Sequence, residues 1–238
     1  MRIAGLQKLT LLDYPGNIAA IIFTKGCNFN CGYCQNSSLI LNDGEELIDE
    51  LEILKYLEKR RKILDAVVIS GGEPTIQKDL KSFIIKIKNM GFKVKLDTNG
   101  YNPNLLEELI NDGLLDYVAM DIKADLNNYE KIACKKINVN NILRSISLLK
   151  ESNIAYEFRT TVIKGIHDIN MVENILNMIG EDSKYYIQNF EDSKDVLDKS
   201  LSGFSKEELH ELKERINRKH ELTSVRGLYS EIGGKSYV

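Results

Sequence analysis

Short apolar runs alternate with longer helical stretches along most of the 238 residues of the chain. The apolar runs, which predict strands, occupy 19–24, 66–70, 93–98, 117–123, 156–163 and 185–190. The helical stretches occupy 45–63, 77–90, 104–112, 139–152, 168–179 and 205–218. Strands that alternate with helices form βαβ units and build a parallel sheet. Because a closed barrel of this kind needs eight units, six units predict an α/β fold with a partial, open TIM-like (β/α)6 barrel, or alternatively a doubly wound sheet.

Local signals place several helix ends. Asn138 and Asp168 are candidate N-caps, and Ser205 has a glutamate three residues later, which is the capping-box pattern. Gly91 and Gly113 lie where two helices should end.

The chain shows no linker, low-complexity stretch or charge block that would divide it. We therefore expect one domain over 1–238. It would comprise a polar, turn-rich extension over 1–17, core βα units over 18–190, and a C-terminal helix and tail over 191–238. A short run after residue 220 could add an edge strand.

Composition excludes several functional classes. The net charge is −3, and acidic and basic residues are mixed along the chain, which argues against a nucleic-acid surface. No apolar run is long enough to span a bilayer, and the first residues lack the apolar region of a signal peptide. We expect a cytoplasmic protein. Since the cytosol keeps thiols reduced, the four cysteines predict metal binding or catalysis and not disulfides.

Three of the four cysteines follow the first predicted strand with the spacing Cys-x3-Cys-x2-Cys: Cys27, Cys31 and Cys34. A structural zinc site usually has four ligands in two close pairs, but no histidine lies near and Cys134 is a hundred residues away. A four-iron cluster usually takes four thiolates. Three thiolates would leave one iron open to a substrate, so we favour an iron–sulfur cluster over zinc.

A glycine pair and several polar residues also lie at the ends of later predicted strands. These residues are Gly71, Gly72, Glu73, Asp97, Asn99, Asp121, Lys123, Glu157, Arg159, Thr161 and Gln188. Each one alone is explained better by a turn or a local ion pair than by a function. The carboxyl ends of parallel strands meet at one edge of the sheet, and buried polar groups need partners. One shared polar ligand would explain the whole set.

The three cysteines, with Tyr33 before the last of them, resemble the signature of radical S-adenosylmethionine (SAM) enzymes. The segments 71–74 (GGEP), 97–100 (DTNG) and 121–123 (DIK) are similar to the activases of glycyl radical enzymes within that superfamily. The opening segments 5–9 (GLQKL) and 12–16 (LDYPG) resemble activating proteins of anaerobic ribonucleoside-triphosphate reductase. The resemblance extends from residue 3 to about residue 190.

The resemblance implies one [4Fe–4S] cluster and SAM as cofactors. By position, Cys27, Cys31 and Cys34 would bind three irons, and the fourth iron would take the amino and carboxylate groups of SAM. At the methionyl amino group of SAM, the implied contacts are Gly71, Gly72 and Glu73, and the backbone of Tyr33 would lie near the adenine. The ribose and carboxylate would be held by Asp97, Asp121, Lys123 and Arg159. Asn99 and Gln188 are further implied SAM contacts. A monovalent cation near Asp97, Thr98 and Asp121 is a further expectation from some relatives.

The resemblance also implies an activity. The protein would cleave SAM reductively and generate a glycyl radical on a large partner enzyme, for which anaerobic ribonucleotide reductase is the first candidate. A reduced flavodoxin- or ferredoxin-type protein would donate the electron. Two features depart from the family or have no role in it. Gln35 follows the last cysteine where many relatives have histidine, and Cys134 matches no ligand, so we expect it to be a small buried hydrophobe. For His167 the alternatives are a residue that lines the pocket and a plain loop residue, and we expect the second.

Alternatives remain open at this point. The partner could be pyruvate formate-lyase or another glycyl radical enzyme. The chain could instead be a compact radical SAM enzyme that acts on a small molecule, such as a deazapurine-forming carbocycle synthase. A zinc- or iron-binding interaction module is the alternative that is not an enzyme.

Overall fold

The structure is a computed structural model that describes residues 1–41, 46–218 and 220–226. The chain forms two compact units. Unit 1 comprises Met1–Asn30, Asn36–Met120 and Asn138–Tyr156, and unit 2 comprises Cys31–Gln35, Asp121–Ile137 and the chain from Glu157 onward. The expectation of a single domain over 1–238 stays a prediction.

Unit 1 contains strands β1 (Ile3–Thr10), β2 (Ala19–Thr24), β3 (Ala66–Gly71), β4 (Lys93–Thr98) and the first four residues of β5 (Tyr117–Asp121). Strands β2 to β5 pair in chain order and are parallel, as expected. The opening differs from the expectation, because it contains strand β1, antiparallel to β2 with two register shifts. Its burial does not alternate along the strand, since only Ile3 and Thr10 are buried. Apolar and polar residues do not alternate in this segment either, so the sequence did not predict a strand here.

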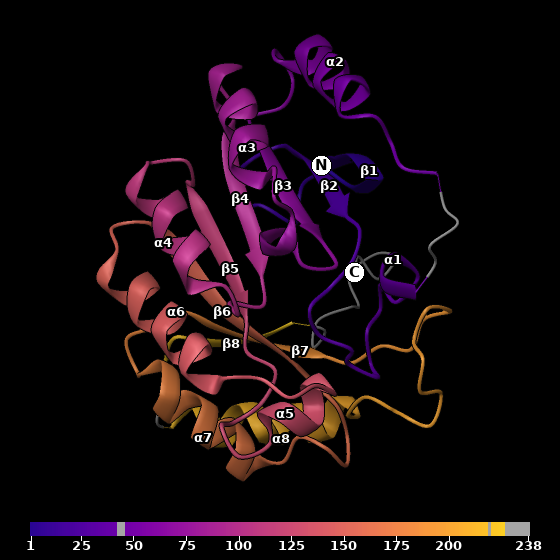
Figure 1. Cartoon of the computed structure of the whole chain (residues 1–238). Coiled ribbons are helices and arrows are strands. Elements are labelled where there is room, and N and C mark those ends of the chain that lie inside the picture. Colours follow the sequence, from indigo (N-terminus) through magenta and orange to yellow (C-terminus); the bar gives the residue numbers. More distant parts are fainter. Residues whose placement is uncertain (42–45, 219, 227–238) are drawn as a thin grey trace. The chain divides into compact units, whose positions relative to one another are not determined.

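The helices of unit 1 are α1 (Ser38–Leu41), α2 (Glu50–Arg60), the 3-10 turn η1 (Pro74–Ile76), α3 (Leu80–Asn89), α4 (Pro103–Asn111) and α6 (Val139–Glu151). Figure 1 shows α3 running along strands β3 and β4. The Asn138 side chain caps α6, and Gly91 and Gly113 follow α3 and α4 with positive φ, as predicted. The expected helix over 45–63 is shorter, and its first residue lies outside the described residues.

One face of the unit 1 sheet carries a small apolar cluster. It comprises Tyr14, Ala19, Ile21, Ala66, Val68 and Tyr117, with Phe23 packed against it. The rings of Tyr14 and Tyr117 lie 5.6 Å apart between centroids. The opening segment therefore contributes an aromatic side chain to the core near the amino ends of β2, β3 and β5.

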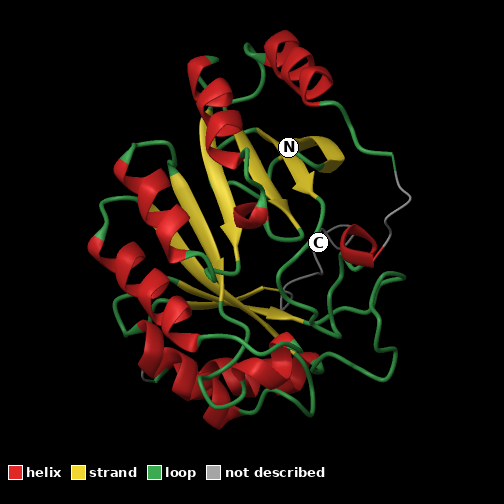
Figure 2. Ribbon diagram, in the orientation of Figure 1, coloured by secondary structure: helices red, strands yellow, loops and turns green. Residues whose placement is uncertain are grey.

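Unit 2 contains β6 (Ala155–Val162) from Glu157 onward, β7 (Tyr185–Asn189) and β8 (Thr223–Arg226), which pair in that order and are parallel. Its helices are α5 (Tyr129–Ala133), α7 (Ile169–Ile179) and α8 (Lys206–Asn217). Asp168 caps α7, and Ser205 forms a capping box with Glu208 at the start of α8. These caps and the additional strand after residue 220 confirm the expectations, whereas the five-residue helix α5 was not predicted. Figure 2 shows the alternation of helices and strands along the chain.

Among the helices that the structure describes, none has the length and apolar character needed to cross a membrane.

Candidate functional site

Two glycines bring the end of β3 against the segment that precedes Cys27. A Cβ atom on Gly71 would lie 2.3 Å from the backbone nitrogen of Thr24, and one on Gly72 would lie 2.0 Å from the carbonyl oxygen of Gly26. The peptide nitrogen of Glu73 also donates to that Gly26 oxygen at 2.8 Å. Real Cβ atoms do not approach this closely, so both positions need glycine. The glycine pair thus fixes the backbone that leads into the first cysteine.

Glu73 joins the ends of β3 and β4. Its carboxylate accepts four hydrogen bonds, from the nitrogen (3.0 Å) and hydroxyl (2.6 Å) of Thr75, the hydroxyl of Thr98 (2.7 Å) and the nitrogen of Asn99 (2.7 Å). Only 1% of Glu73 is exposed. Burial raises the pKa of Glu73, and the four hydrogen bonds counteract that rise. In this arrangement the side chain positions the two strand ends, because both of its oxygens already accept from the protein.

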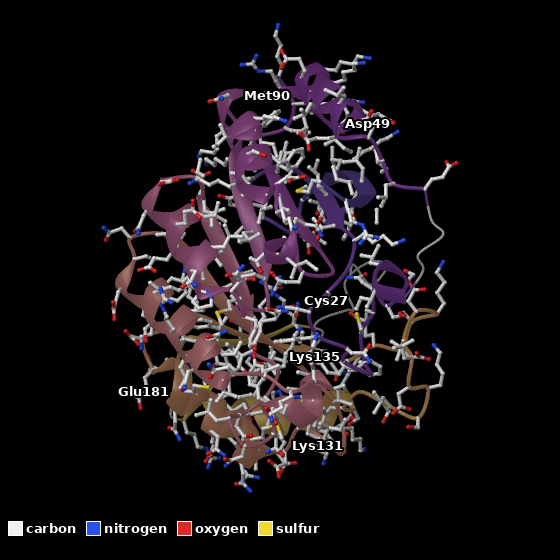
Figure 3. All side chains as sticks on the ribbon, in the orientation of Figure 1. Cys27, Asp49, Met90, Lys131, Lys135 and Glu181 are labelled. Carbon is white, nitrogen blue, oxygen red and sulfur yellow. The ribbon has the colours of Figure 1, made fainter. Side chains whose placement is uncertain are left out.

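Asn99 connects the end of β4 with the residue after the first cysteine. Its amide nitrogen donates to the side-chain oxygen of Asn28 at 2.7 Å. The Cys27 sulfur accepts from the nitrogen of Phe29 at 3.3 Å, and Cys27 is labelled in Figure 3. The sequence pattern did not single out Asn28, although its place inside the cysteine motif was the available signal.

Asp97 lies beside a buried lysine that the sequence reasoning also missed. Lys95 and Asp97 share one face of β4, and their charged atoms lie 3.3 Å apart. Lys95 also donates to the carbonyl oxygen of Asp13, and its ammonium lies 5.5 Å from the centre of the Tyr117 ring. Lys95 thereby connects the opening segment to a predicted SAM contact. A charged residue two positions before Asp97 in an otherwise apolar strand was the signal.

In unit 2, the carboxylate of Asp121 pairs with two positively charged side chains. Asp121 accepts from Nζ of Lys123 at 3.1 Å and from Nε of Arg159 at 2.9 Å. Burial would raise the pKa of Asp121, but Arg159 and Lys123 together lower it to about 2. Burial would likewise lower the pKa of Lys123, yet Asp121 raises it well above the usual value. The three predicted SAM contacts therefore form one charged group with a net positive charge.

The backbone of Lys123 is fixed from two sides. Its nitrogen donates to the hydroxyl of Tyr129 at 3.3 Å, and its carbonyl oxygen lies 3.0 Å from Nε2 of His167. Nδ1 of His167 accepts from the nitrogen of Ile163, so Nε2 carries the proton and donates. His167 is buried, and burial lowers the pKa of the ring, which keeps it neutral. His167 lies in the loop between β6 and α7, as expected, and it also fixes the backbone of Lys123.

The short segment 31–35 brings two of the three clustered cysteines into unit 2. Cys31 is 7% exposed and Cys34 is half-buried. Burial raises the pKa of the Cys31 thiol, while the charge of Lys123 lowers it. The ring of Tyr33 is also buried, and burial raises the pKa of its hydroxyl well above the usual value. The charge of Lys123 therefore offsets part of the cost of forming the Cys31 thiolate, which is the form that binds metals.

The last two residues singled out in the sequence are Cys134 and Gln188. Cys134 is exposed and ends α5 in the left-handed conformation (φ 50°), so the expectation of a buried hydrophobe is wrong. Its thiol lies at the exposed end of the short helix, 3.5 Å from the carbonyl oxygen of Lys131. Gln188 is half-buried on β7 and is paired in register with Thr161 and Arg226.

The predicted site residues divide between the units. Unit 1 contains Cys27, Gly71, Gly72, Glu73, Asp97, Thr98 and Asn99, and unit 2 contains Cys31, Tyr33, Cys34, Asp121, Lys123, Arg159 and Gln188. All three clustered cysteines are free thiols. Among the described residues, no group of three or more His, Cys, Asp or Glu side chains has the arrangement of a preformed metal site. The donor set of three free thiols in eight residues, without nearby histidine, fits an iron–sulfur cluster better than zinc.

Comparison with known proteins agrees with this chemistry. The sequence profile described as "Radical SAM superfamily" matches residues 21–179. "Putative glycyl-radical enzyme activating enzyme MJ1227" of Methanocaldococcus jannaschii is 36% identical over 222 residues, which cover 89% of each chain. A second protein of the same organism, "Putative glycyl-radical enzyme activating enzyme MJ1632", is 31% identical over 77% of this chain and 68% of its own length. The crystal structure of Streptococcus suis SuiB has a TM-score of 0.69 at 15% identity, over 89% of this chain and 51% of the SuiB chain.

The chain therefore belongs to the radical SAM superfamily and, within it, to the family of glycyl-radical enzyme activating proteins. It is a radical SAM enzyme, and the cofactors of that superfamily are a [4Fe–4S] cluster and SAM. The fold is α/β with a parallel sheet that is open and not closed, as expected.

Proposed function

We propose that this protein activates anaerobic ribonucleoside-triphosphate reductase by generating a glycyl radical on it. The observation that carries the proposal is the opening sequence, 5–9 (GLQKL) and 12–16 (LDYPG), which resembles that branch of the activases. The 36% identity to a protein named as a glycyl-radical enzyme activating enzyme supports the coarser class.

The structure is consistent with a functional opening segment. Tyr14 is only 4% exposed, and its ring lies in the apolar cluster of unit 1. The Asp13 carbonyl accepts from Lys95, which in turn pairs with Asp97. The opening motif is therefore linked through Lys95 to Asp97, which is a predicted SAM contact. A change in this motif would alter the position of Asp97.

The residues fit the two cofactors by their chemistry. Cys27, Cys31 and Cys34 would provide thiolates for the cluster. Lys123 and Arg159, held by Asp121, would bind the carboxylate of SAM, because a paired cation group offers charge-assisted donors to an anion. The cluster and SAM, when bound, supply a carbon-centred radical that can remove a hydrogen atom from a glycine Cα. The protein orients these groups and excludes water and other hydrogen donors.

Electron paramagnetic resonance (EPR) tests the first part of this proposal. The protein is reconstituted with iron and sulfide without oxygen, reduced, and measured with and without SAM. A [4Fe–4S]+ signal that changes when SAM is added is the expected result. A signal that does not respond to SAM, or a zinc protein without colour, would contradict the proposal.

The identity of the partner is tested separately. The reduced protein and SAM are mixed with purified anaerobic ribonucleotide reductase or with pyruvate formate-lyase, and the organic glycyl radical signal is counted per partner chain. The proposal expects the radical on the reductase. A radical on pyruvate formate-lyase alone would move the protein to the other branch. Cleavage of SAM with neither partner labelled would favour the alternative of an enzyme that acts on a small molecule.

A further inference from the structure

We propose that unit 1 carries two surfaces of opposite charge through which two copies of this chain form a two-fold dimer. One surface is a groove between helices α4 and α6, and the other is the C-terminal end of helix α2. Every residue of both surfaces belongs to unit 1. The dimer does not depend on which glycyl radical enzyme the protein activates.

The first surface is a groove that we call the acidic groove. It has a volume of about 840 Å³ and lies between the C-terminal ends of α4 and α6, beside the loops that lead into β5 and β6. Figure 1 shows α4 and α6 side by side, and the two helices are in contact. Half-buried side chains of Ile110, Leu148 and Ile154 line the groove, so an occupant would also bury apolar surface there.

The charged side chains that line the acidic groove are all negative. They are Glu107, Asp116 and Glu151, and no lysine or arginine is among the described residues of the lining. Glu107 pairs with Arg144, which lies outside the lining. Asp116 pairs with Lys88, also outside the lining, at 2.7 Å. Glu151 is exposed and forms no ion pair with any residue that the structure describes.

The helix ends make this arrangement of carboxylates unusual. The C-terminal end of a helix carries partial negative charge, so it favours cations and disfavours carboxylates. Helix α4 has no basic residue in its last turn and has Asp112 as its C-cap, and α6 ends with Lys150 and Glu151. A cationic occupant would relieve this repulsion, because it would lie near two helix C-termini and three carboxylates.

The second surface is the C-terminal end of α2, which we call the α2 basic patch. It comprises four consecutive exposed cations, Lys59, Arg60, Arg61 and Lys62. Arg61 pairs with Glu58 at 3.1 Å. Lys59 and Lys62 form no ion pair within the part of the chain that the structure describes. Two of the four charges are therefore available to a partner.

The two surfaces match each other in charge and in apolar content. Ile63 follows the α2 basic patch directly and is 47% exposed, so the patch presents an apolar side chain next to its cations, as the groove does next to its carboxylates. The patch alone would not indicate a partner, because cations suit the end of α2 without one. The acidic groove does indicate a cationic partner, and the same chain supplies one.

The position of both surfaces in unit 1 allows a closed dimer. The α2 basic patch precedes β3, which begins at Ala66, and the acidic groove includes Asp116 and Ala155, at the starts of β5 and β6. Both surfaces thus lie toward the amino ends of the strands. In a two-fold dimer the patch of each copy binds the groove of the other, so both contacts form together. Gly72 and Asn99 follow the carboxyl ends of β3 and β4, away from these contacts.

The test reverses the charge of each surface in the reconstituted full-length protein. The patch variant is Lys59→Glu/Lys62→Glu, and the groove variant is Asn111→Lys/Glu151→Lys. All four side chains are exposed and take part in no hydrogen bond or ion pair among the described residues, so the substitutions remove no such contact. Sedimentation velocity without oxygen measures the mass from about 1 to 100 µM protein, which covers weak to moderate affinities.

We expect the wild type to be a dimer at about 100 µM and low salt, and to dissociate at about 0.5 M salt, where exposed charges are screened. Each variant alone should be a monomer, with the dimer dissociation constant raised at least about hundredfold, because like charges then face each other. An equimolar mixture of the two variants should form a heterodimer, since both contacts then join opposite charges. One chain that carries all four substitutions should dimerise again for the same reason.

Two controls separate the contact from net charge and from folding. Lys135→Glu/Lys136→Glu changes the net charge as the patch variant does, at exposed lysines of unit 2, and should stay a dimer. Urea denaturation and cleavage of SAM with dithionite as reductant should be as in the wild type for every variant. If the patch variant is destabilised, Lys59→Gln/Lys62→Gln should still weaken the dimer.

Several results would overturn the dimer. They are a wild type that is monomeric at every concentration, a dimer that both variants keep, or a mixture of the two variants that stays monomeric. Equal dissociation by the control variant would also overturn it, since net charge would then set the association. A monomeric wild type whose groove variant alone loses binding to the glycyl radical enzyme would assign the groove to that partner instead. The proposed function is tested separately by the response of the cluster to SAM.

Discussion

At the residue scale, the strongest constraints on residue type occur where two backbone segments are so close that no Cβ atom fits between them. Gly72 is the clearest example, since its Cβ would overlap the carbonyl oxygen of Gly26. From the sequence, the glycine pair could be read as space for a ligand. The structure shows that the space is occupied by the neighbouring strand end.

Substitution of Gly72 by alanine should therefore be severe. The added methyl group meets backbone, which cannot move aside as a flexible side chain can, so we expect a loss of more than about 3 kcal/mol in the free energy of unfolding. Gly113→Ala is the matched control, because no atom lies within 4 Å of its Cβ and only its positive φ (65°) is unfavourable. It should cost about 1 kcal/mol. Urea denaturation measures both, and equal losses would contradict the steric explanation.

The ion pairs of Asp121 should make the free energy of unfolding decrease in acid. Its folded pKa of about 2 lies below the ordinary value of 3.8, so the folded state binds its proton less readily than the unfolded state does. The stability that it contributes is present above pH 4 and is lost as the pH falls toward 2. Because the side chain is 31% exposed and partly screened, we expect a contribution on the order of 1 kcal/mol.

The measurement is the free energy of unfolding from pH 5 to pH 2 in wild type and in Asp121→Asn. The variant should show a smaller decrease over this interval. A decrease as steep as in the wild type would show that other carboxylates cause it.

At the scale of elements, strand β4 couples the opening segment to the candidate site. Its residues alternate between two faces, so Lys95 and Asp97 point the same way as the cluster around Tyr117. Charged residues two apart were visible in the sequence. The carbonyl of Asp13, which accepts the hydrogen bond from Lys95, is far away in the chain and could not have been inferred.

Lys95→Met should destabilise unit 1 by about 3 kcal/mol, because it removes a buried cation and with it the ion pair of the half-buried Asp97. Lys95→Met/Asp97→Asn should recover part of this loss, since no uncompensated charge then remains. Urea denaturation of the two single variants and the double variant gives the coupling energy directly. Additive effects would mean that the two side chains do not interact.

At the scale of the whole molecule, the cysteine count limits the cofactor content. Only Cys134 remains outside the cluster motif, so we expect one cluster and about four irons per chain after reconstitution. Cys134→Ala should keep that iron and its absorbance, whereas Cys31→Ala should lose both. About eight irons per chain, or iron retained by Cys31→Ala, would contradict the assignment of the thiols.

The sequence alone determined the βα alternation, the caps at Asn138, Asp168 and Ser205, and the chemistry of the cysteine motif. These are local properties: periodicity, capping side chains and thiol spacing depend on residues a few positions apart. The tertiary structure decided that Glu73 joins two strand ends, that His167 fixes the backbone of Lys123 and that Cys134 faces solvent. Those facts depend on contacts between distant segments, which form only when the chain packs, and no local pattern specifies them.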